Sequence, residues 1–264
     1  MPELPDVEGF RRFLERHARG ARIDRVDAPD AVLVRNRTPR ELDGALKGHH
    51  FGTPWRHGKW LIAPVGDVEV LMHFGMTGLL SWVSTHDGAS RHPHDRIIFV
   101  CDGGELRYNN MRRFGGIWLA ADAGERQGIT GPLGPDAAAV DRAAFEQLIR
   151  GRRGAVKAAL MDQRLLAGVG NLLSDEILWR AGVHPGTPVR EIGRVRRERL
   201  YTAMRAAIGE STRYGRVPHG ARWLTRVRDE RDSRCPRCGT PLSRGTLAGR
   251  TACWCPRCQP RRRR

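Results

Sequence analysis

Four cysteines near the carboxyl end place the tightest constraint on how this chain can fold. They form two Cys-x2-Cys pairs separated by sixteen residues, in a segment rich in Gly, Pro and Arg: Cys235, Cys238, Cys255 and Cys258. Each pair presents two thiolates from one tight turn, and two such turns close a tetrahedral zinc site. Because four thiolates fill the coordination sphere, we expect one structural Zn²⁺ ion. Cys101 and Cys253 lie off this spacing and are expected to pack in the core.

The balance of charge is the second constraint. The 264 residues carry a formal net charge of +17, and residues 222–264 hold thirteen arginines against Asp229, Glu230 and Asp232, a local net charge of +10. Arginine binds phosphate through paired hydrogen bonds, so this balance indicates a polyanionic partner and binding that weakens with salt. A merely soluble basic surface is the alternative. We expect no membrane span and no secretory signal, because no apolar stretch of the required length occurs.

The amino terminus reads Met1-Pro2-Glu3-Leu4-Pro5. Initiator methionine is readily removed before proline, which would leave Pro2 as a free secondary amine beside Glu3. An α-amino group has a pKa of about 8, so a useful fraction is unprotonated at neutral pH and can form a Schiff base with an electrophilic carbon. The simpler interpretation is that Pro2 and Pro5 only stiffen the first turn of a helix.

The pattern of apolar residues changes along the chain. Val7, Phe10, Leu14 and His17 share one face of a helix that Gly20 ends. Residues 21–120 are expected to form a sandwich or barrel-like β domain with that one helix against it. Four runs are expected to be strands, the last two as a hairpin around Asp102-Gly103-Gly104: 60–62, 68–72, 97–101 and 105–108.

A segment full of helix and strand breakers, 130–136, is the expected domain boundary. Helical patterns follow it, at 137–150, 155–162, 171–181 and 190–209. Between two of these helices lies the turn 166–171, whose two glycines leave backbone amides free to face a phosphate at the start of a helix.

Several motifs occur together, and they span nearly the whole chain: Pro2-Glu3-Leu4-Pro5, His57-Gly58-Lys59-Trp60, His73-Phe74-Gly75-Met76-Thr77-Gly78, Arg112-Arg113-Phe114-Gly115, Met161 to Asn171, and the four-cysteine finger. In this order they resemble the formamidopyrimidine-DNA glycosylase and endonuclease VIII family, and the glycosylase branch most closely. The resemblance implies an α+β multidomain fold. Its expected parts are a catalytic β-sandwich with an N-terminal helix over 1–130, a helix–two-turn–helix domain over 137–222, a zinc-finger β-hairpin over 232–260 and a basic tail over 261–264.

The resemblance also implies a bifunctional DNA glycosylase and abasic-site lyase of base excision repair. The Pro2 amine would attack C1′ of a nucleotide rotated out of the duplex, and Glu3 would shuttle protons. Lys59 resembles the family's β-elimination lysine, and Arg250 resembles the hairpin arginine linked to δ-elimination. Taken alone, Lys59 and Arg250 would be ordinary phosphate clamps.

Further residues are expected to hold DNA. Met76, Arg112 and Phe114 resemble a wedge that fills the space left by the extruded base, although core packing is the alternative for the two apolar residues. The expected backbone contacts are Asn171, Arg152 and Arg250, followed by His92, His73, Arg113 and Lys157. Glu176 resembles a family carboxylate near the proline, although an ordinary helix salt bridge would look the same. The implied partner is damaged double-stranded DNA, and the implied protein is a bacterial, cytoplasmic, nucleoid-associated monomer.

Some positions depart from the family pattern. Asp6 stands where glutamate is usual, Asn110-Met111 where Asp-Pro is common, and residues 227–230 read Val-Arg-Asp-Glu in place of Val-Tyr-Gly-Arg. The segment before Cys235 is short and lacks the Gly-Gly-Thr-type loop that many members fold over an oxidised purine. The lesion therefore stays open between oxidised purines, oxidised pyrimidines and other bases. A non-catalytic nucleic-acid-binding zinc-finger protein is the alternative from another class.

Overall fold

A computed structural model describes residues 2–261. Met1 and residues 262–264 of the expected basic tail lie outside the described residues. The described chain divides into two compact units, each with its own apolar core. Pro2 and Asp6–Pro132 form the first, and Glu3–Pro5 with residues 133–261 form the second. The three residues after Pro2 therefore pack with a part of the chain more than 130 positions away.

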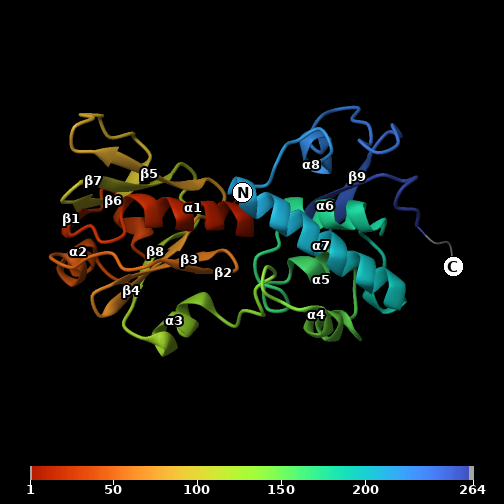
Figure 1. Ribbon diagram of the computed structural model, residues 1–264, viewed down its shortest axis with the longest axis horizontal. Helices are drawn as coiled ribbons and strands as arrows, with labels where there is room; N and C mark the ends of the chain where they lie inside the picture. Colours follow the sequence, from red (N-terminus) through yellow and green to blue (C-terminus); the bar gives the residue numbers. More distant parts are fainter. Residues whose placement is uncertain (1, 262–264) are drawn as a thin grey trace. The chain divides into compact units, whose positions relative to one another are not determined.

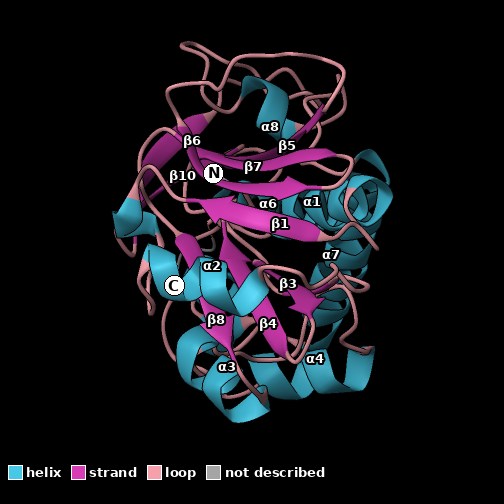
Figure 2. Cartoon of the chain, turned by 90° about the vertical axis from the view of Figure 1, so that its left-hand side faces the viewer, coloured by secondary structure: helices cyan, strands magenta, loops and turns pink. Residues whose placement is uncertain are grey.

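Two four-stranded antiparallel sheets build the first unit, in the orders β1-β6-β7-β5 and β2-β3-β4-β8 (Figure 1). Their strands are β1 Ile23–Asp27, β2 Trp55–His57, β3 Trp60–Val65, β4 Val68–His73, β5 Gly78–Ser84, β6 Asp95–Cys101, β7 Gly104–Asn110 and β8 Gly116–Ala120. Figure 2 shows the sheets as two layers. Met72 and Ile117 of one sheet and Phe99 and Tyr108 of the other are buried in one cluster, so the core lies between the layers. The expected sandwich is confirmed.

The expected hairpin is confirmed, because β6 and β7 pair antiparallel across Asp102-Gly103. The strands expected over 60–62 and 68–72 are confirmed as β3 and β4. Short apolar, β-rich runs bounded by turn residues indicated these strands in the sequence, and each has three consecutive buried residues at its centre.

Three helices belong to this part of the chain, so the expectation of a single helix is wrong. They are α1 Leu4–His17, α2 Pro39–Leu46 and α3 Ala123–Thr130. Thr38 and Glu41 form a reciprocal capping box at the start of α2, and Asp122 caps α3. Thr38-Pro39-Arg40-Glu41 is a recognisable helix start, so this signal was available in the sequence.

The second unit is helical and ends in a two-stranded hairpin. Its elements are α4 Arg142–Ile149, α5 Val156–Met161, α6 Asn171–Ala181, α7 Arg194–Tyr214, α8 Leu224–Val227, β9 Ser243–Leu247 and β10 Arg250–Trp254. The helix expected from 137 begins only at Arg142, because Asp141 is its N-cap. The helix expected to end at 209 continues to Tyr214, where Gly215 adopts the left-handed conformation.

A buried charge cluster joins α5, α6 and β10. The Asp175 carboxylate accepts hydrogen bonds from Lys157 Nζ, from Arg228 Nε at 2.8 Å and from the backbone N–H of Cys253 at 3.2 Å. Lys157 and Arg228 also donate to the carbonyl oxygen of Thr251, at 2.9 and 3.0 Å. Burial lowers the pKa of Lys157, and the Asp175 carboxylate opposes that shift. Removing the one anion would leave two buried cations facing each other.

We therefore expect Asp175→Ala to destabilise the second unit by on the order of 3–5 kcal/mol, the cost of uncompensated buried charge. Asp229→Ala is the matched control, because Asp229 also pairs with Arg228 but its side chain is 76% exposed. An exposed pair contributes about 0–1 kcal/mol. Thermal and denaturant unfolding measure both variants. Equal losses would show that the cluster does not stabilise the fold.

Candidate active site and zinc centre

The carboxylate of Glu3 is fully buried and lies at the amino end of α6. It accepts hydrogen bonds from the backbone N–H groups of Gly170 at 2.8 Å, Leu172 at 2.7 Å and Leu173 at 3.1 Å. The first amides of a helix have no partner within the helix, and the helix dipole favours an anion at this end. Glu3 therefore satisfies orphan donors of α6 and is held rigidly in return.

The glycines of the preceding turn make room for this contact. A Cβ atom at Gly170 would overlap the carboxyl group of Glu3, and one at Gly168 would overlap Leu4. The backbone amide of Leu4 also donates to the carbonyl oxygen of Gly168 at 3.1 Å. The expectation that these amides face a phosphate is wrong at Gly170, because a carboxylate of the same chain occupies them.

Gln163 holds this turn, and the sequence analysis did not single it out. Its amide donates to the carbonyl oxygens of Met161 and Val169, both at 2.8 Å, and accepts from the N–H of Gly168 at 2.9 Å. Its place inside the Met161–Asn171 motif was the available signal. Gln163 therefore fixes the backbone of the turn whose amides hold Glu3.

Lys59 and His73 lie on the second sheet of the first unit. Lys59 follows Gly58 in the turn between β2 and β3, and His73 ends β4. His73 Nδ1 accepts a hydrogen bond from the N–H of Gly75, and its ring packs 4.9 Å from Trp60. Burial, and then the charge of Lys59, lower the pKa of His73 to about 4. His73 is therefore neutral at pH 7.

The side chain of His73 faces an open cleft of about 510 Å³. The cleft is lined by Arg35, Trp60, His73, Gly115, Trp118 and Ile129. It combines aromatic walls with one guanidinium and a neutral imidazole.

Two neighbouring loops carry the expected wedge. The side chains of Met76 and Phe114 are 38% and 51% exposed, so neither is a core residue. Arg112 lies beside them, with its guanidinium carbon 5.4 Å from the centre of the Phe114 ring. The loop also exposes Met111, which the sequence analysis noted only as a departure from the family pattern. Arg113 has positive φ and turns its Nε to Asp30 at 2.7 Å.

The other expected DNA contacts divide into exposed and buried groups. The side chains of His92, Arg152 and Arg250 are exposed, and Arg250 begins β10 beside the hairpin turn. Asn171 is half-buried, and its Oδ1 has no hydrogen-bond partner among the described residues. The Oδ1 atom is itself buried, so this acceptor at the start of α6 is unsatisfied in the structure.

Lys157 requires a correction. It is fully buried in the Asp175 cluster, so the DNA contact expected for it is contradicted by its position. Glu176 is also fully buried, where it pairs with Arg180 at 2.7 Å and accepts from the N–H of Leu224 at 2.8 Å. In this structure Glu176 anchors α8.

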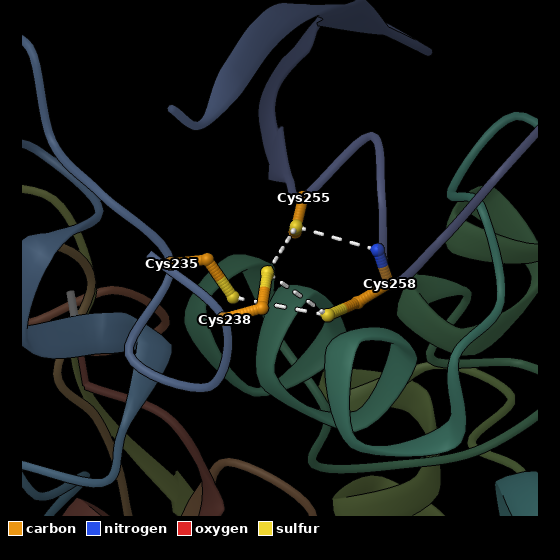
Figure 3. Close-up of side chains that lie close together, drawn as sticks. All are labelled: Cys235, Cys238, Cys255 and Cys258. Atoms are coloured by element: carbon orange, nitrogen blue, oxygen red, sulfur yellow. Dashed lines mark hydrogen bonds between the residues drawn. The ribbon is translucent and has the colours of Figure 1, made fainter. Parts of the chain in front are cut away.

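The four cysteines of the finger point toward one another at the base of the β9–β10 hairpin (Figure 3). Their sulfur atoms all lie within 4.8 Å of one another, with Sγ–Sγ distances of 3.9 Å for Cys235–Cys258 and 3.5 Å for Cys238–Cys255. A tetrahedral ion with Zn–S bonds of about 2.3 Å requires sulfur atoms about 3.8 Å apart. The donor set therefore fits Zn²⁺.

Groups outside the finger hold its ligands in place. Trp179 of α6 donates its indole N–H to Cys235 Sγ at 3.3 Å, and Arg237 stacks over the Trp179 ring at 4.4 Å. Gln259 accepts from the N–H of Cys255 and donates to the carbonyl oxygen of Val183, both at 2.9 Å. The finger is thus anchored to α6 and to the loop after it.

The remaining two cysteines pack in the cores, as expected. Cys101 and Cys253 are buried. Burial raises the pKa of the Cys101 thiol to about 12 and that of the Cys253 thiol to about 11. Neither is a thiolate at neutral pH.

Comparisons with known proteins agree with this arrangement. The chain matches the formamidopyrimidine-DNA glycosylase N-terminal domain over residues 1–117, the H2TH domain of that glycosylase over 133–218, and the zinc finger found in FPG and IleRS over 232–261. Formamidopyrimidine-DNA glycosylases of Geobacter metallireducens and Acidothermus cellulolyticus are 36% and 34% identical to it. The alignments cover 98% and 100% of this chain and 100% and 99% of theirs.

Solved structures give the same result. The Lactococcus lactis formamidopyrimidine-DNA glycosylase, bound non-covalently to DNA with an abasic site, superimposes with a TM-score of 0.88 at 27% identity. MutM in complex with DNA containing carbocyclic 8-oxo-G superimposes with a TM-score of 0.87, also at 27% identity. Both cover 98% of this chain and 100% of the other.

The chain belongs to the formamidopyrimidine-DNA glycosylase family. The expected fold class, with a sheet domain, a helix–two-turn–helix domain and a zinc-finger hairpin, is confirmed. The finger holds one structural zinc ion. In the part of the chain that the structure describes, none of the helices is both long and apolar enough to cross a membrane.

We expect Cys238→Ser to lose zinc and DNA binding together while the first unit stays folded. Four thiolates bind zinc with a folding free energy on the order of 10 kcal/mol or more in small modules. Cys253→Ala is the matched control, because Cys253 lies on the same hairpin but outside the four-sulfur cluster. Metal analysis and a DNA-binding titration measure both. Full DNA binding by a zinc-free protein would refute the assignment.

Proposed function

We propose that this chain is a bifunctional DNA glycosylase and abasic-site lyase of base excision repair. Its family membership supports the glycosylase class, and the placement of Glu3 supports the proposed chemistry most directly. The Glu3 carboxylate is fixed by three backbone amides at the start of α6, and Pro2 is its direct neighbour in the chain. A nucleophile beside a rigidly held carboxylate is the arrangement that proton-coupled amine attack requires.

The first step is base excision. With Met1 removed, the Pro2 nitrogen forms a bond to C1′ of the extruded nucleotide, and the glycosidic bond breaks with its electron pair leaving on the base. Glu3 takes the proton that the amine gives up and passes it to the opening sugar ring oxygen, and an iminium forms between Pro2 and C1′. The departing base takes its proton from water. A secondary amine forms this cation without further proton loss, so proline suits the step.

The second step is strand cleavage. The iminium acidifies the C2′ hydrogen, and removing that proton expels the 3′ phosphate by β-elimination. Expulsion of the 5′ phosphate follows by δ-elimination. We assign Lys59 to the first elimination and Arg250 to the second, with phosphate binding as an additional role of both cations. The exposed position of Arg250 beside the hairpin turn supports access to a phosphate.

DNA binding is assigned to the remaining predicted residues, both exposed and half-buried. Asn171, Arg152 and His92 hold the backbone, and His73 acts as a neutral hydrogen-bonding group in the aromatic cleft. Arg113 can bind the DNA backbone only if its ion pair with Asp30 breaks. Met76, Phe114 and Arg112 enter the duplex, where the apolar pair props the base stack and the arginine meets the unpaired partner base. The exposure of Met76 and Phe114 on adjoining loops supports this assignment.

A second candidate concerns the lesion. Only residues 215–223 separate α7 from α8. Trp223 of this segment is buried under Arg180 at 4.3 Å, and Pro218 is tied to Thr225. A segment this short and this anchored does not supply a long loop to cover an oxidised purine. We therefore propose that oxidised pyrimidines are substrates alongside, or in preference to, oxidised purines.

Domain limits, oligomeric state and location complete the proposal. We assign the catalytic domain to residues 1–130, the DNA-binding helical domain to 137–222, the finger to 232–260 and a basic tail to 261–264. The enzyme acts as a monomer. The relatives it matches are bacterial, and we propose a cytoplasmic, nucleoid-associated location.

Borohydride should trap a covalent complex between the protein and abasic-site DNA, because reduction converts the iminium into a stable amine. Pro2→Gly and Glu3→Gln should reduce base excision sharply, the second because the N–H₂ group that replaces one carboxylate oxygen would face a backbone N–H donor at the start of α6. Trapping on duplexes that contain oxidised purines or oxidised pyrimidines compares the two lesion classes as substrates.

Mass analysis of the amino terminus shows whether each preparation has lost Met1. Full activity of a protein that retains Met1 would contradict the mechanism.

The wedge assignment predicts a difference between substrates. Met76→Ala and Phe114→Ala should weaken excision from duplexes, because unstacking costs a few kcal/mol per step and nothing then fills the gap. Their abasic lyase activity on single strands should persist. Arg112→Ala should reduce the discrimination between bases opposite the lesion by roughly 1–3 kcal/mol. Paired kinetics on both substrates measure this, and equal losses on the two would argue against a wedge.

A further inference from the structure

Asn110 is a fully buried polar residue at the end of β7, directly before the loop that carries Arg112 and Phe114. Its backbone is held by the sheet: the N–H donates to the carbonyl oxygen of His94 at 2.9 Å, and its own carbonyl oxygen accepts from Arg96 at 3.1 Å. The hydrogen bonds of the strand therefore use the backbone of Asn110, and its side-chain amide makes contacts of its own.

The side chain of Asn110 connects the two loops of the proposed wedge. Its Nδ2 donates to the carbonyl oxygen of Phe114 at 2.7 Å and to the hydroxyl of Tyr108 at 3.0 Å. Its Oδ1 accepts from the hydroxyl of Thr77 at 3.2 Å. Thr77 follows Met76 directly, so one amide touches the loop of Met76 and the loop of Phe114.

The network continues on both sides. The Thr77 hydroxyl accepts from the backbone N–H of Arg112 at 3.1 Å, and the Tyr108 hydroxyl donates to the carbonyl oxygen of His73 at 2.8 Å. The two loops are therefore bonded to each other through the buried side chains of Asn110 and Tyr108 and the half-buried hydroxyl of Thr77. Buried networks of this kind are rigid when every member is satisfied.

Close backbone packing reinforces the connection. A Cβ atom at Gly75 would overlap the carbonyl oxygen of Phe114, and one at Gly115 would overlap that of His73. Both glycines have positive φ. The two loops consequently touch backbone to backbone, and a shift of one must move the other.

The chemistry of the site calls for an amide. The groups facing Asn110 are two acceptors, the Phe114 carbonyl and the Tyr108 oxygen, and one donor, the Thr77 hydroxyl. Asparagine offers N–H donors and a carbonyl acceptor on one short side chain. An ionised aspartate would offer acceptors only and would face the Phe114 carbonyl oxygen with a negative charge.

We infer that Asn110 is the positioning residue of the wedge. It locks the loops of Met76 and Phe114 into one rigid body that enters the base stack as a unit. The inference rests on the proposed function, because it concerns how the wedge of that reaction is held. Asn110 itself touches no reacting atom.

The test compares two isosteric variants. Asn110→Leu removes the donors and the acceptor but keeps a side chain of nearly the same shape, and Thr77→Val removes the hydroxyl shared by Asn110 and Arg112. Each should lower excision from a lesion-containing duplex by about tenfold to a hundredfold, the effect of losing one buried hydrogen bond. Abasic lyase activity on single strands should stay within about twofold. The fluorescence of 2-aminopurine beside the lesion, which reports unstacking, should rise more slowly in both variants.

Asn36→Ala is the matched control. Asn36 is also an asparagine of the first unit whose side-chain amide bonds the backbone. It donates to the carbonyl oxygen of Leu119 at 2.8 Å and accepts from the N–H of Leu119 at 3.0 Å. None of its hydrogen bonds reaches either wedge loop. It should lose stability without changing the ratio of duplex to single-strand rates.

Two outcomes would overturn the inference separately from the function. If the native protein excises lesions and both isosteric variants keep the native rate ratio, Asn110 does not position the wedge. If they lose duplex and single-strand activity in parallel, as a general folding defect would cause, the inference also fails. A native protein that neither excises nor is trapped on any substrate would overturn the proposed function, and this inference with it.

Discussion

The hydrogen bonds between Glu3 and the first amides of α6 are the interaction on which the rest of the proposed site depends. They bring a residue from the beginning of the sequence into the core of the helical unit and fix it where an anion is most favourable. Because Pro2 is covalently attached to Glu3, its position is set by a helix and not by a free chain end. A flexible terminus would have to be ordered in every catalytic cycle, at a cost in entropy.

Helix α6 supports more than this one contact. Its middle residues are buried, and three of them hold different neighbours: Asp175 holds the hairpin and the basic pair, Glu176 holds α8, and Trp179 holds a zinc ligand. A helix with so many polar contacts on its buried face does not show the apolar stripe of an ordinary amphipathic helix. Its sequence is explained by the neighbours it organises.

The sequence predicted the sandwich, the β6–β7 hairpin and the finger because β-rich runs, turn residues and cysteine spacing are local signals. It did not predict α3, which has little apolar character, or the late start of the expected 137–150 helix at Arg142. Contacts between residues that are distant in the sequence were harder to predict than the elements themselves. The turn at Gly170 resembles an anion site, and only the fold shows that Glu3 is the anion. Lys157 looked like a DNA contact because burial by Asp175, eighteen residues away, leaves no mark in the sequence.

The attachment of the finger to α6 has a consequence for how the protein responds to its surroundings. Trp179 ties one zinc ligand to the helix whose first turn holds Glu3, and Gln259 ties another to the loop directly after that helix. Metal binding contributes folding free energy to any element packed on the site. Loss of the zinc ion is therefore expected to loosen α6 and, with it, the backbone amides that hold Glu3 in place.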